Sequence, residues 1–283
     1  MQARRPIASP HARSGITMLE VLVLIGIFIM LAALILPAIR SGGRTVPRKI
    51  HCIYNLKNLG LAIQTRASLE NDTLPYLDEG NVGWPRMILA EIGESAALRK
   101  GDFEGKVQVF TCPDDPNNFN VSGGLSYRAN SGYAGVYSVT SDPRNEWSLA
   151  NYRRSGVMFS KSLVPKRVRL YEVDSGDGVS NTLLLSERAD VAATFGGSTK
   201  LGFGLRFKAM SGTAFNTVDI EKNAIGNSGV SPGPTSNHTG VTNVVFCDGH
   251  TSSLSHSIDK KVYAKLLSHA GSRNGESELE QGY

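Results

Sequence analysis

The sequence predicts an α+β protein with an N-terminal transmembrane helix, a second helix separated from the first by a break near 41–47, and a head built on an antiparallel β-sheet. Three observations support this fold class. A long apolar run opens the chain, a stretch with helical spacing of apolar residues follows it, and short β-prone segments separated by glycine, proline and asparagine fill the second half.

The first element is the apolar run over 16–39. Its 24 residues would form about 36 Å of helix, enough to span a hydrocarbon core of roughly 30 Å. A secretory signal peptide is one alternative, but its apolar stretch is about 7–15 residues and ends at a small-residue cleavage site, which this run lacks. A plain signal anchor is the other. Glu20 lies near the start of the run, where a charge costs up to roughly 3 kcal/mol, so this carboxylate needs a partner.

The second helix is expected after an interruption at Ser41-Gly42-Gly43 and Pro47, which predicts a flexible or kinked joint. Apolar residues at three- and four-residue spacing then predict a helix over 53–67. These residues are Ile53, Leu56, Leu59, Ile63 and Ala67.

The rest of the head reads as strands with long loops. Segments 107–110, 168–171 and 182–185 have the β-prone composition of strands. The clearest hairpin pairs 241–247 with 250–254, because an Asp-Gly pair between β-prone runs favours a turn with positive φ at both centres. A closing helix is predicted after this hairpin, with Ser257 as its N-cap.

Composition limits the classes of function. The chain has 283 residues, of which 19% are charged, as expected of a globular domain. Its net charge of +5 falls to +2 without 1–15, which hold Arg4, Arg5 and Arg13 and no acid. The remaining basic residues form no stripe interleaved with aromatics, so we expect no nucleic-acid partner.

The three cysteines leave one without a partner if a disulfide forms. In an exported domain, Cys52 and Cys112 are candidates for a disulfide, although their spacing alone does not establish the pair. Cys247 ends an apolar strand, where a buried free thiol is expected. The chain lacks closely spaced pairs of cysteine and histidine that would indicate zinc.

Two groups of residues are candidate sites. His238 lies ten positions before Asp248-Gly249; a structural role at the entrance of the hairpin is the favoured interpretation, with ligand binding and catalysis as alternatives. No Gly-x-Ser-x-Gly nucleophile motif accompanies the histidine, so the chain is not expected to be an enzyme. Asp174, Asp177 and Glu187 are oxygen ligands of the kind that bind Ca²⁺, but solvated turn carboxylates are the simpler interpretation, and we expect no cofactor.

The N-terminal segment resembles the prepilin-type signal of type IV pilins and type II secretion pseudopilins. Gly15, Ile16, Thr17, Leu19 and Glu20, with the apolar stretch through Pro37, carry this resemblance. It implies cleavage after Gly15 by a prepilin peptidase, N-methylation of Ile16, and a role for Glu20 in registering a new subunit against a neighbour's N-terminal amine. Many members carry phenylalanine after the glycine, where this chain has isoleucine.

The whole chain resembles a bacterial, planctomycete-type family of pseudopilin-like proteins, a domain of unknown function with a C-terminal His-x9-Asp-Gly motif. The motif residues here are His238, Asp248 and Gly249. Further matching stretches are 52–62, 110–116, 126–130 and 177–182.

These resemblances imply a leader over 1–15, a transmembrane helix over 16–39, an extracytoplasmic pilin-like α+β domain over 40–270 and a disordered tail over 271–283. The expected protein is a structural subunit of a type II secretion or type IV pilus-like assembly. It would be a single-pass protein of the bacterial inner membrane, with a prepilin peptidase and like or related pilin-type subunits as partners. The alternative is a monomeric, membrane-tethered binding module for carbohydrate, peptide or metal.

Overall fold

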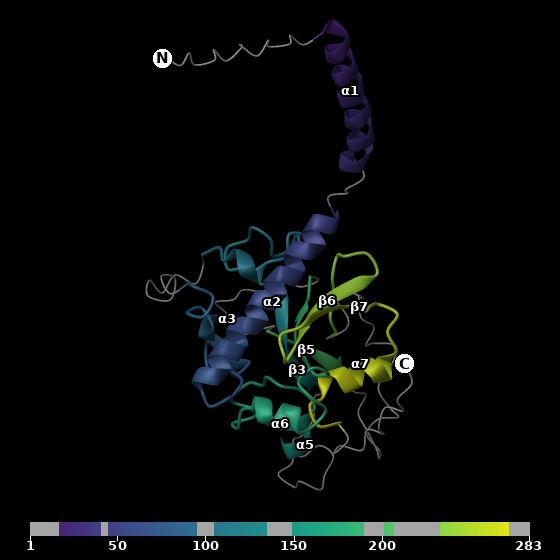
Figure 1. The fold of residues 1–283 in the computed structure, drawn as a ribbon. Coiled ribbons are helices and arrows are strands. Elements are labelled where there is room, and N and C mark those ends of the chain that lie inside the picture. Colours follow the sequence, from purple (N-terminus) through teal and green to yellow (C-terminus); the bar gives the residue numbers. More distant parts are fainter. Residues whose placement is uncertain are drawn as a thin grey trace, which may run out of the picture. The chain divides into compact units, whose positions relative to one another are not determined.

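A computed structural model describes residues 17–40, 45–94, 105–134, 149–189, 201–206 and 233–271. It confirms an α+β architecture and divides into two compact units, 1–46 and 47–283 (Figure 1). The described elements are α1 (Met18–Arg40), α2 (Thr45–Leu69), β1 (Asp78–Glu79), β2 (Val82–Gly83), α3 (Trp84–Met87), η1 (Gln108–Phe110), β3 (Tyr127–Ala134), α5 (Leu149–Arg154), α6 (Leu170–Asp174), β4 (Leu183–Glu187), β5 (Gly202–Arg206), β6 (Val241–Phe246), β7 (Thr251–Ser255) and α7 (Lys260–Leu267).

Helix α1 corrects one prediction. Across the described residues, no helix combines the length and the apolar character needed to cross a membrane. The predicted transmembrane helix over 16–39, and with it the single-pass location in an inner membrane, is therefore wrong.

Helix α2 is the long helix of the head, and it includes the predicted 53–67 segment. Pro47 lies in its first turn, where a missing N–H breaks no helical hydrogen bond, so this proline belongs to the helix start. Asn71 and Asp72 follow its end with positive φ angles of 56° and 55°. At Gly60 the helix approaches the sheet so closely that an added Cβ would lie 2.8 Å from Cγ2 of Val245.

Five of the described strands form a mixed sheet in the order β5-β3-β4-β6-β7, and β1 and β2 form a separate two-stranded sheet. All neighbours are antiparallel except β3 and β5, which run parallel. The purely antiparallel prediction is thus wrong at this edge. The predicted C-terminal hairpin is present as β6 and β7, but its turn is wider than two residues, since the Gly249 N–H donates to the Phe246 carbonyl and only Gly249 has positive φ there.

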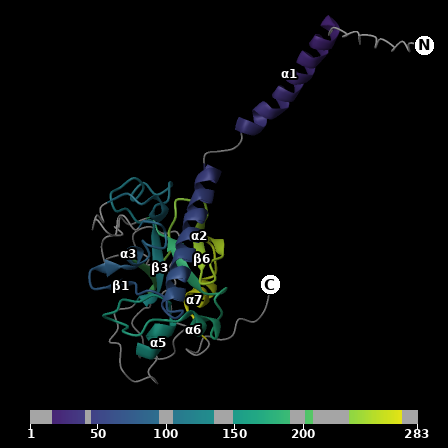
Figure 2. The same cartoon turned by 60° about the vertical axis from the view of Figure 1, so that its left-hand side comes forward.

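Helices cover both faces of the sheet, as Figures 1 and 2 show. Neighbouring residues of β6 point to opposite faces, as a strand requires. Val245 packs with the α2 residues Leu56 and Leu59 in the larger core, whereas Val244 packs with Tyr263 of α7 in the smaller core. Helices α5 and α6 lie beside the C-terminal end of α2, where the Leu170 N–H donates to the Asp72 carbonyl.

Three local predictions are wrong. Residues 108–110 form the 3₁₀ helix η1, and 170–174 form helix α6 where a strand was expected. The N-cap of α7 is Asp259, whose carboxylate accepts from the N–H groups of Lys261 and Val262, while Ser257 lies outside the helix. Residues 1–16 and 272–283, which include the predicted leader and nearly all of the predicted disordered tail, lie outside the described residues.

Candidate functional site

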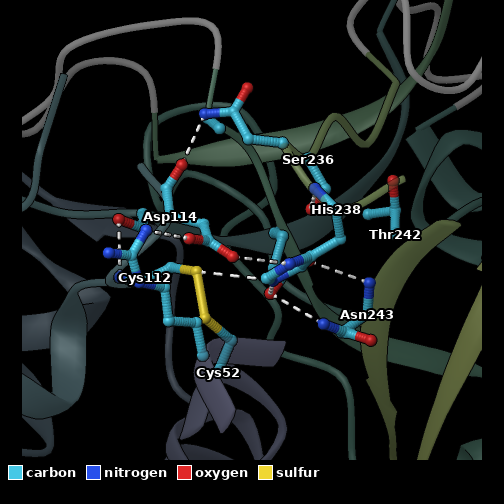
Figure 3. Close-up of polar contacts among 12 residues, drawn as sticks. Cys52, Cys112, Asp114, Ser236, His238, Thr242 and Asn243 are labelled. Carbon is cyan, nitrogen blue, oxygen red and sulfur yellow. Dashed lines mark hydrogen bonds and ion pairs between the residues drawn. A yellow bond between two sulfur atoms is a disulfide. The ribbon is translucent and has the colours of Figure 1, made fainter. Parts of the chain in front are cut away.

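In the described part of the head, side chains from distant parts of the chain converge in a buried polar cluster. His238, Glu187, Asn243 and Asp114 surround the disulfide between Cys52 and Cys112. Figure 3 shows Asp114 and the disulfide to one side of His238 and Asn243 to the other. Strands β4 and β6, helix α2 and the loop after η1 each contribute to this cluster.

Glu187 is the centre of the cluster. It is the last residue of β4, and its pairing partner β6 carries Asn243. The two oxygens of Glu187 accept from the Asn243 backbone N–H at 2.9 Å and from the Asn243 side-chain amide at 3.0 Å. The carboxylate is 2% exposed. A charge this deeply buried is tolerated because donors from β6 solvate it in place of water.

His238 lies between two carboxylates. Its Nδ1 is 3.1 Å from Oδ2 of Asp114, and its Nε2 is 3.3 Å from Oε1 of Glu187. Burial by itself lowers the pKa of the imidazole, but the hydrogen bond and charge of Glu187 and the charge of Asp114 outweigh it and raise the pKa above its ordinary value. The cluster therefore favours the imidazolium form.

The disulfide between Cys52 and Cys112 forms the remaining boundary of the cluster. Cys52 lies in the N-terminal half of α2, and Cys112 follows η1 in the loop that also carries Asp114. The side-chain amide of Asn55 donates to the Thr111 carbonyl at 3.0 Å, and the Cys112 N–H donates to Oγ of Ser126 at 3.0 Å. The Cys112 sulfur is 3.5 Å from Nε2 of His238.

The structure separates other residues that the sequence grouped. Asp248 contacts Nδ1 of His250 at 2.6 Å, so the two ends of the His-x9-Asp-Gly motif have different partners. Asp177 accepts from the Gly271 N–H at 2.8 Å, and Asp174 is exposed at the end of α6. Among the described residues, the group of potential metal ligands that converges is Cys52, Cys112, Glu187 and His238, which includes neither aspartate.

The N-terminal unit holds the other candidate residues. Gly15 and Ile16 lie outside the described residues. Glu20 accepts from the Thr17 backbone N–H at 3.1 Å, and the Glu20 N–H donates to Oγ1 of Thr17 at 3.3 Å. This reciprocal pair is a capping box at the start of α1. The Thr-x-x-Glu spacing could have revealed it from the sequence alone.

Asp114 and Asn243 are the site residues that sequence reasoning missed. Asp114 belongs to the Cys-Pro-Asp-Asp-Pro stretch, whose position after a cysteine was a usable signal. Asn243 lies in a largely apolar strand, where a polar residue with an amide is a candidate partner for a buried group. Cys247 is buried and free as expected, and burial raises the pKa of its thiol well above the ordinary value.

A second buried histidine provides a test of pH dependence. His269 is 2% exposed, and its Nδ1–H donates to the Gly156 carbonyl at 2.7 Å. Burial lowers its pKa to about 4, with Arg153 acting in the same direction and the Gly156 bond, Glu172 and Asp177 opposing. Between pH 6.5 and 4, His269 is therefore protonated in the unfolded chain but not in the folded chain.

The contribution of His269 to the free energy of unfolding should therefore be complete above pH 6.5. It should fall by about 3 kcal/mol as the pH drops toward 4. Urea unfolding at a series of pH values measures the slope. In the His269→Gln variant, the part of the slope due to this histidine should disappear, and the exposed His51→Gln is the matched control. An unchanged slope in His269→Gln would contradict the assignment.

Fold and site together define an α+β head with mixed-sheet topology in which a disulfide and a His–carboxylate cluster join α2 to β4 and β6. The model of the family described as protein of unknown function (DUF1559) matches residues 42–261. This match covers most of the chain, so the protein belongs to the DUF1559 family. No curated protein and no solved structure matches it.

Proposed function

We propose that this protein is a structural, pilin-like subunit that assembles with like or related subunits through α1. In this proposal a prepilin peptidase cleaves after Gly15 and leaves Ile16 as the new N-terminus. The single observation that carries the proposal is the surface of α1, which is apolar on all sides and bears one carboxylate, Glu20, in the described part of the helix.

The apolar surface of α1 needs a partner. Its large hydrophobic side chains are exposed around the whole helix, from 44% for Val21 to 84% for Met18. A helix that is apolar all round is normally buried, and exposed apolar surface of this extent marks an interaction site. A second copy of the same helix offers matching apolar chemistry, so we assign like subunits as the occupant.

The charge on Glu20 gives such an assembly its register. In one chain this carboxylate already satisfies the Thr17 N–H through the capping box. A carboxylate has capacity for further donors, and the amine exposed by cleavage before Ile16 is a charged donor of opposite sign. Pairing between the Glu20 of one subunit and the amine of the next would favour a single axial offset.

Two substitutions separate the charge of Glu20 from its capping role. Glu20→Gln keeps a side chain that can complete the capping box but removes the charge, whereas Glu20→Ala removes both. We expect both variants to lose the crosslinked ladders that the wild-type chain gives in cells with a prepilin peptidase. Mass spectrometry of the mature N-terminus should find a methylated peptide that begins at Ile16.

Normal ladders from Glu20→Gln would show that the residue serves only as a helix cap and would overturn its role in register. A wild-type chain that stays monomeric after crosslinking would overturn assembly itself. An intact leader that begins at Met1 in that chain would also contradict the proposal, because the amine of Ile16 would not be exposed.

The alternative is a monomeric binding module for carbohydrate, peptide or metal. It is favoured by a polar surface pocket of about 520 Å³ in the head. However, its cations Arg66, Lys161 and Arg167 are paired with Glu70, Glu79 and Glu91, so the pocket offers little unbalanced charge to a ligand. The pocket is lined by Arg66, Glu70, Pro75, Tyr76, Glu79, Val82, Met87, Lys161 and Arg167. Persistent monomers in the crosslinking experiment would support this module.

A further inference from the structure

We propose that reduction of the Cys52–Cys112 disulfide converts the buried cluster of the head into a tetrahedral Zn²⁺ site, with His238 and Glu187 as the other two ligands. The proposal rests on residues of the head and is independent of assembly through α1. In the oxidised chain the same residues form the hydrogen-bonded cluster described above, so the site has two chemical states.

The ligand atoms are already close to the required arrangement. One atom from each of Cys52, Cys112, Glu187 and His238 lies within 4.8 Å of all the others. Zinc bonds of about 2.0–2.3 Å place tetrahedral ligands roughly 3.3–3.8 Å apart. The Cys112 sulfur to His238 Nε2 distance is 3.5 Å, and the His238 Nε2 to Glu187 Oε1 distance is 3.3 Å. Two of the ligand–ligand distances therefore already match those of a tetrahedral zinc site without a metal.

The identity of the ligands favours zinc. Two thiolates, an imidazole and a carboxylate form a mixed set that suits Zn²⁺, whereas Ca²⁺ takes oxygen ligands alone. All four residues are buried, which shields a bound ion from competing water. This set differs from the calcium candidates in the sequence, which shared only Glu187 with it.

Surrounding groups orient the ligands in the way that metal sites require. The Nδ1–H of His238 points to Asp114, which leaves Nε2 directed into the cluster, as in carboxylate–histidine–zinc arrangements. Asn243 donates to both oxygens of Glu187 and holds that carboxylate in place. Zinc would take the position of the proton between Nε2 and Glu187.

The required movement is the separation of the two sulfurs to about 3.8 Å. Cys52 lies within α2 and Cys112 follows η1, so this separation is a side-chain rotation that leaves both backbone segments in place. A dithiol supplies two electrons and two protons: it becomes a cyclic disulfide, and the protein gains two thiols. Zn²⁺ then displaces the two thiol protons, together with the imidazole proton at Nε2.

Metal titration of the full chain tests this proposal. The Cys247→Ser background removes the third thiol, so that any thiolate signal comes from Cys52 and Cys112. After reduction by dithiothreitol and its removal without oxygen, Co²⁺ should bind with one equivalent per chain. Its spectrum should show tetrahedral d–d bands and a thiolate-to-cobalt charge-transfer band, and Zn²⁺ should displace it.

Variants assign the other ligands. His238→Ala and Glu187→Gln should each weaken binding by more than about 100-fold, and Asp114→Asn, a milder change to an orienting residue, by about 10–100-fold. Asp177→Asn, outside the cluster, is the matched control and should have no effect.

Several results would overturn the proposal. A reduced chain that binds no metal, whether folded or unfolded, contradicts it. Binding without the charge-transfer band, or equal binding by the oxidised chain, would show that the cysteines are not ligands. Unchanged affinity in both His238→Ala and Asp114→Asn would remove the histidine from the site.

Discussion

Replacing Glu187 by alanine should lower the free energy of unfolding by about 3–5 kcal/mol, the cost of leaving charged and polar partners buried without their counterpart. The carboxylate is 2% exposed and accepts both the main-chain and the side-chain N–H groups of Asn243. It also lies 3.3 Å from Nε2 of His238. Its loss therefore affects two buried residues. Urea unfolding of the oxidised chain, followed by circular dichroism, measures the change.

Glu79→Ala is the matched control for this variant. Glu79 also pairs with a cation, Lys161, but the two side chains are 49% and 50% exposed. Exposed ion pairs contribute about 0–1 kcal/mol because water replaces each partner when the other is removed. If Glu187→Ala cost no more than Glu79→Ala, the cluster would not be a stabilising element of the head.

Loss of the disulfide should produce a comparably large effect. Cys52 and Cys112 are 60 residues apart in the sequence, and closing a loop of that size removes about 4 kcal/mol of chain entropy from the unfolded state. The double variant Cys52→Ala/Cys112→Ala should therefore unfold at a much lower urea concentration than the oxidised wild type. The measurement is made with a chelator present, so that metal binding does not contribute.

Cys247→Ala is the control for this second experiment. It removes a buried sulfur without opening a cross-link, and its cost should be limited to a small cavity. Equal destabilisation by the double variant and by Cys247→Ala would mean that the cross-link itself adds nothing. The disulfide and Glu187 both contact His238, so their effects should not be additive, and a double-mutant cycle would measure the coupling.

Local patterns predicted the parts of the fold that depend on local contacts. The three- and four-residue spacing from Ile53 to Ala67 identified α2, and the Asp-Gly pair identified the β6–β7 hairpin. The 168–171 segment forms only an isolated antiparallel bridge, between Arg169 and Thr73, before helix α6 begins at Leu170. The parallel pairing of β3 with β5 joins segments about 70 residues apart, and no local pattern encodes it.

The candidate site shows the same limit more strongly. Glu187 and His238 were both singled out from the sequence, but in different groups. Their proximity depends on the register between β4 and β6, which brings Glu187 to Asn243, and on the loop that carries Asp114. Charged residues on separate strands meet only after tertiary packing is set. At the N-terminus the reverse holds, since the Thr17–Glu20 capping box is local and readable.

The position of the disulfide also determines how this domain would respond to mechanical load. Tension that enters the head at Pro47 travels only as far as Cys52 before it meets a covalent bond to Cys112. From there the force continues toward β3, and the intervening 53–111 segment, with most of α2, is bypassed. A chain pulled from its N-terminal end would therefore extend by about 59 residues less when oxidised than when reduced, which would make its mechanical compliance depend on redox state.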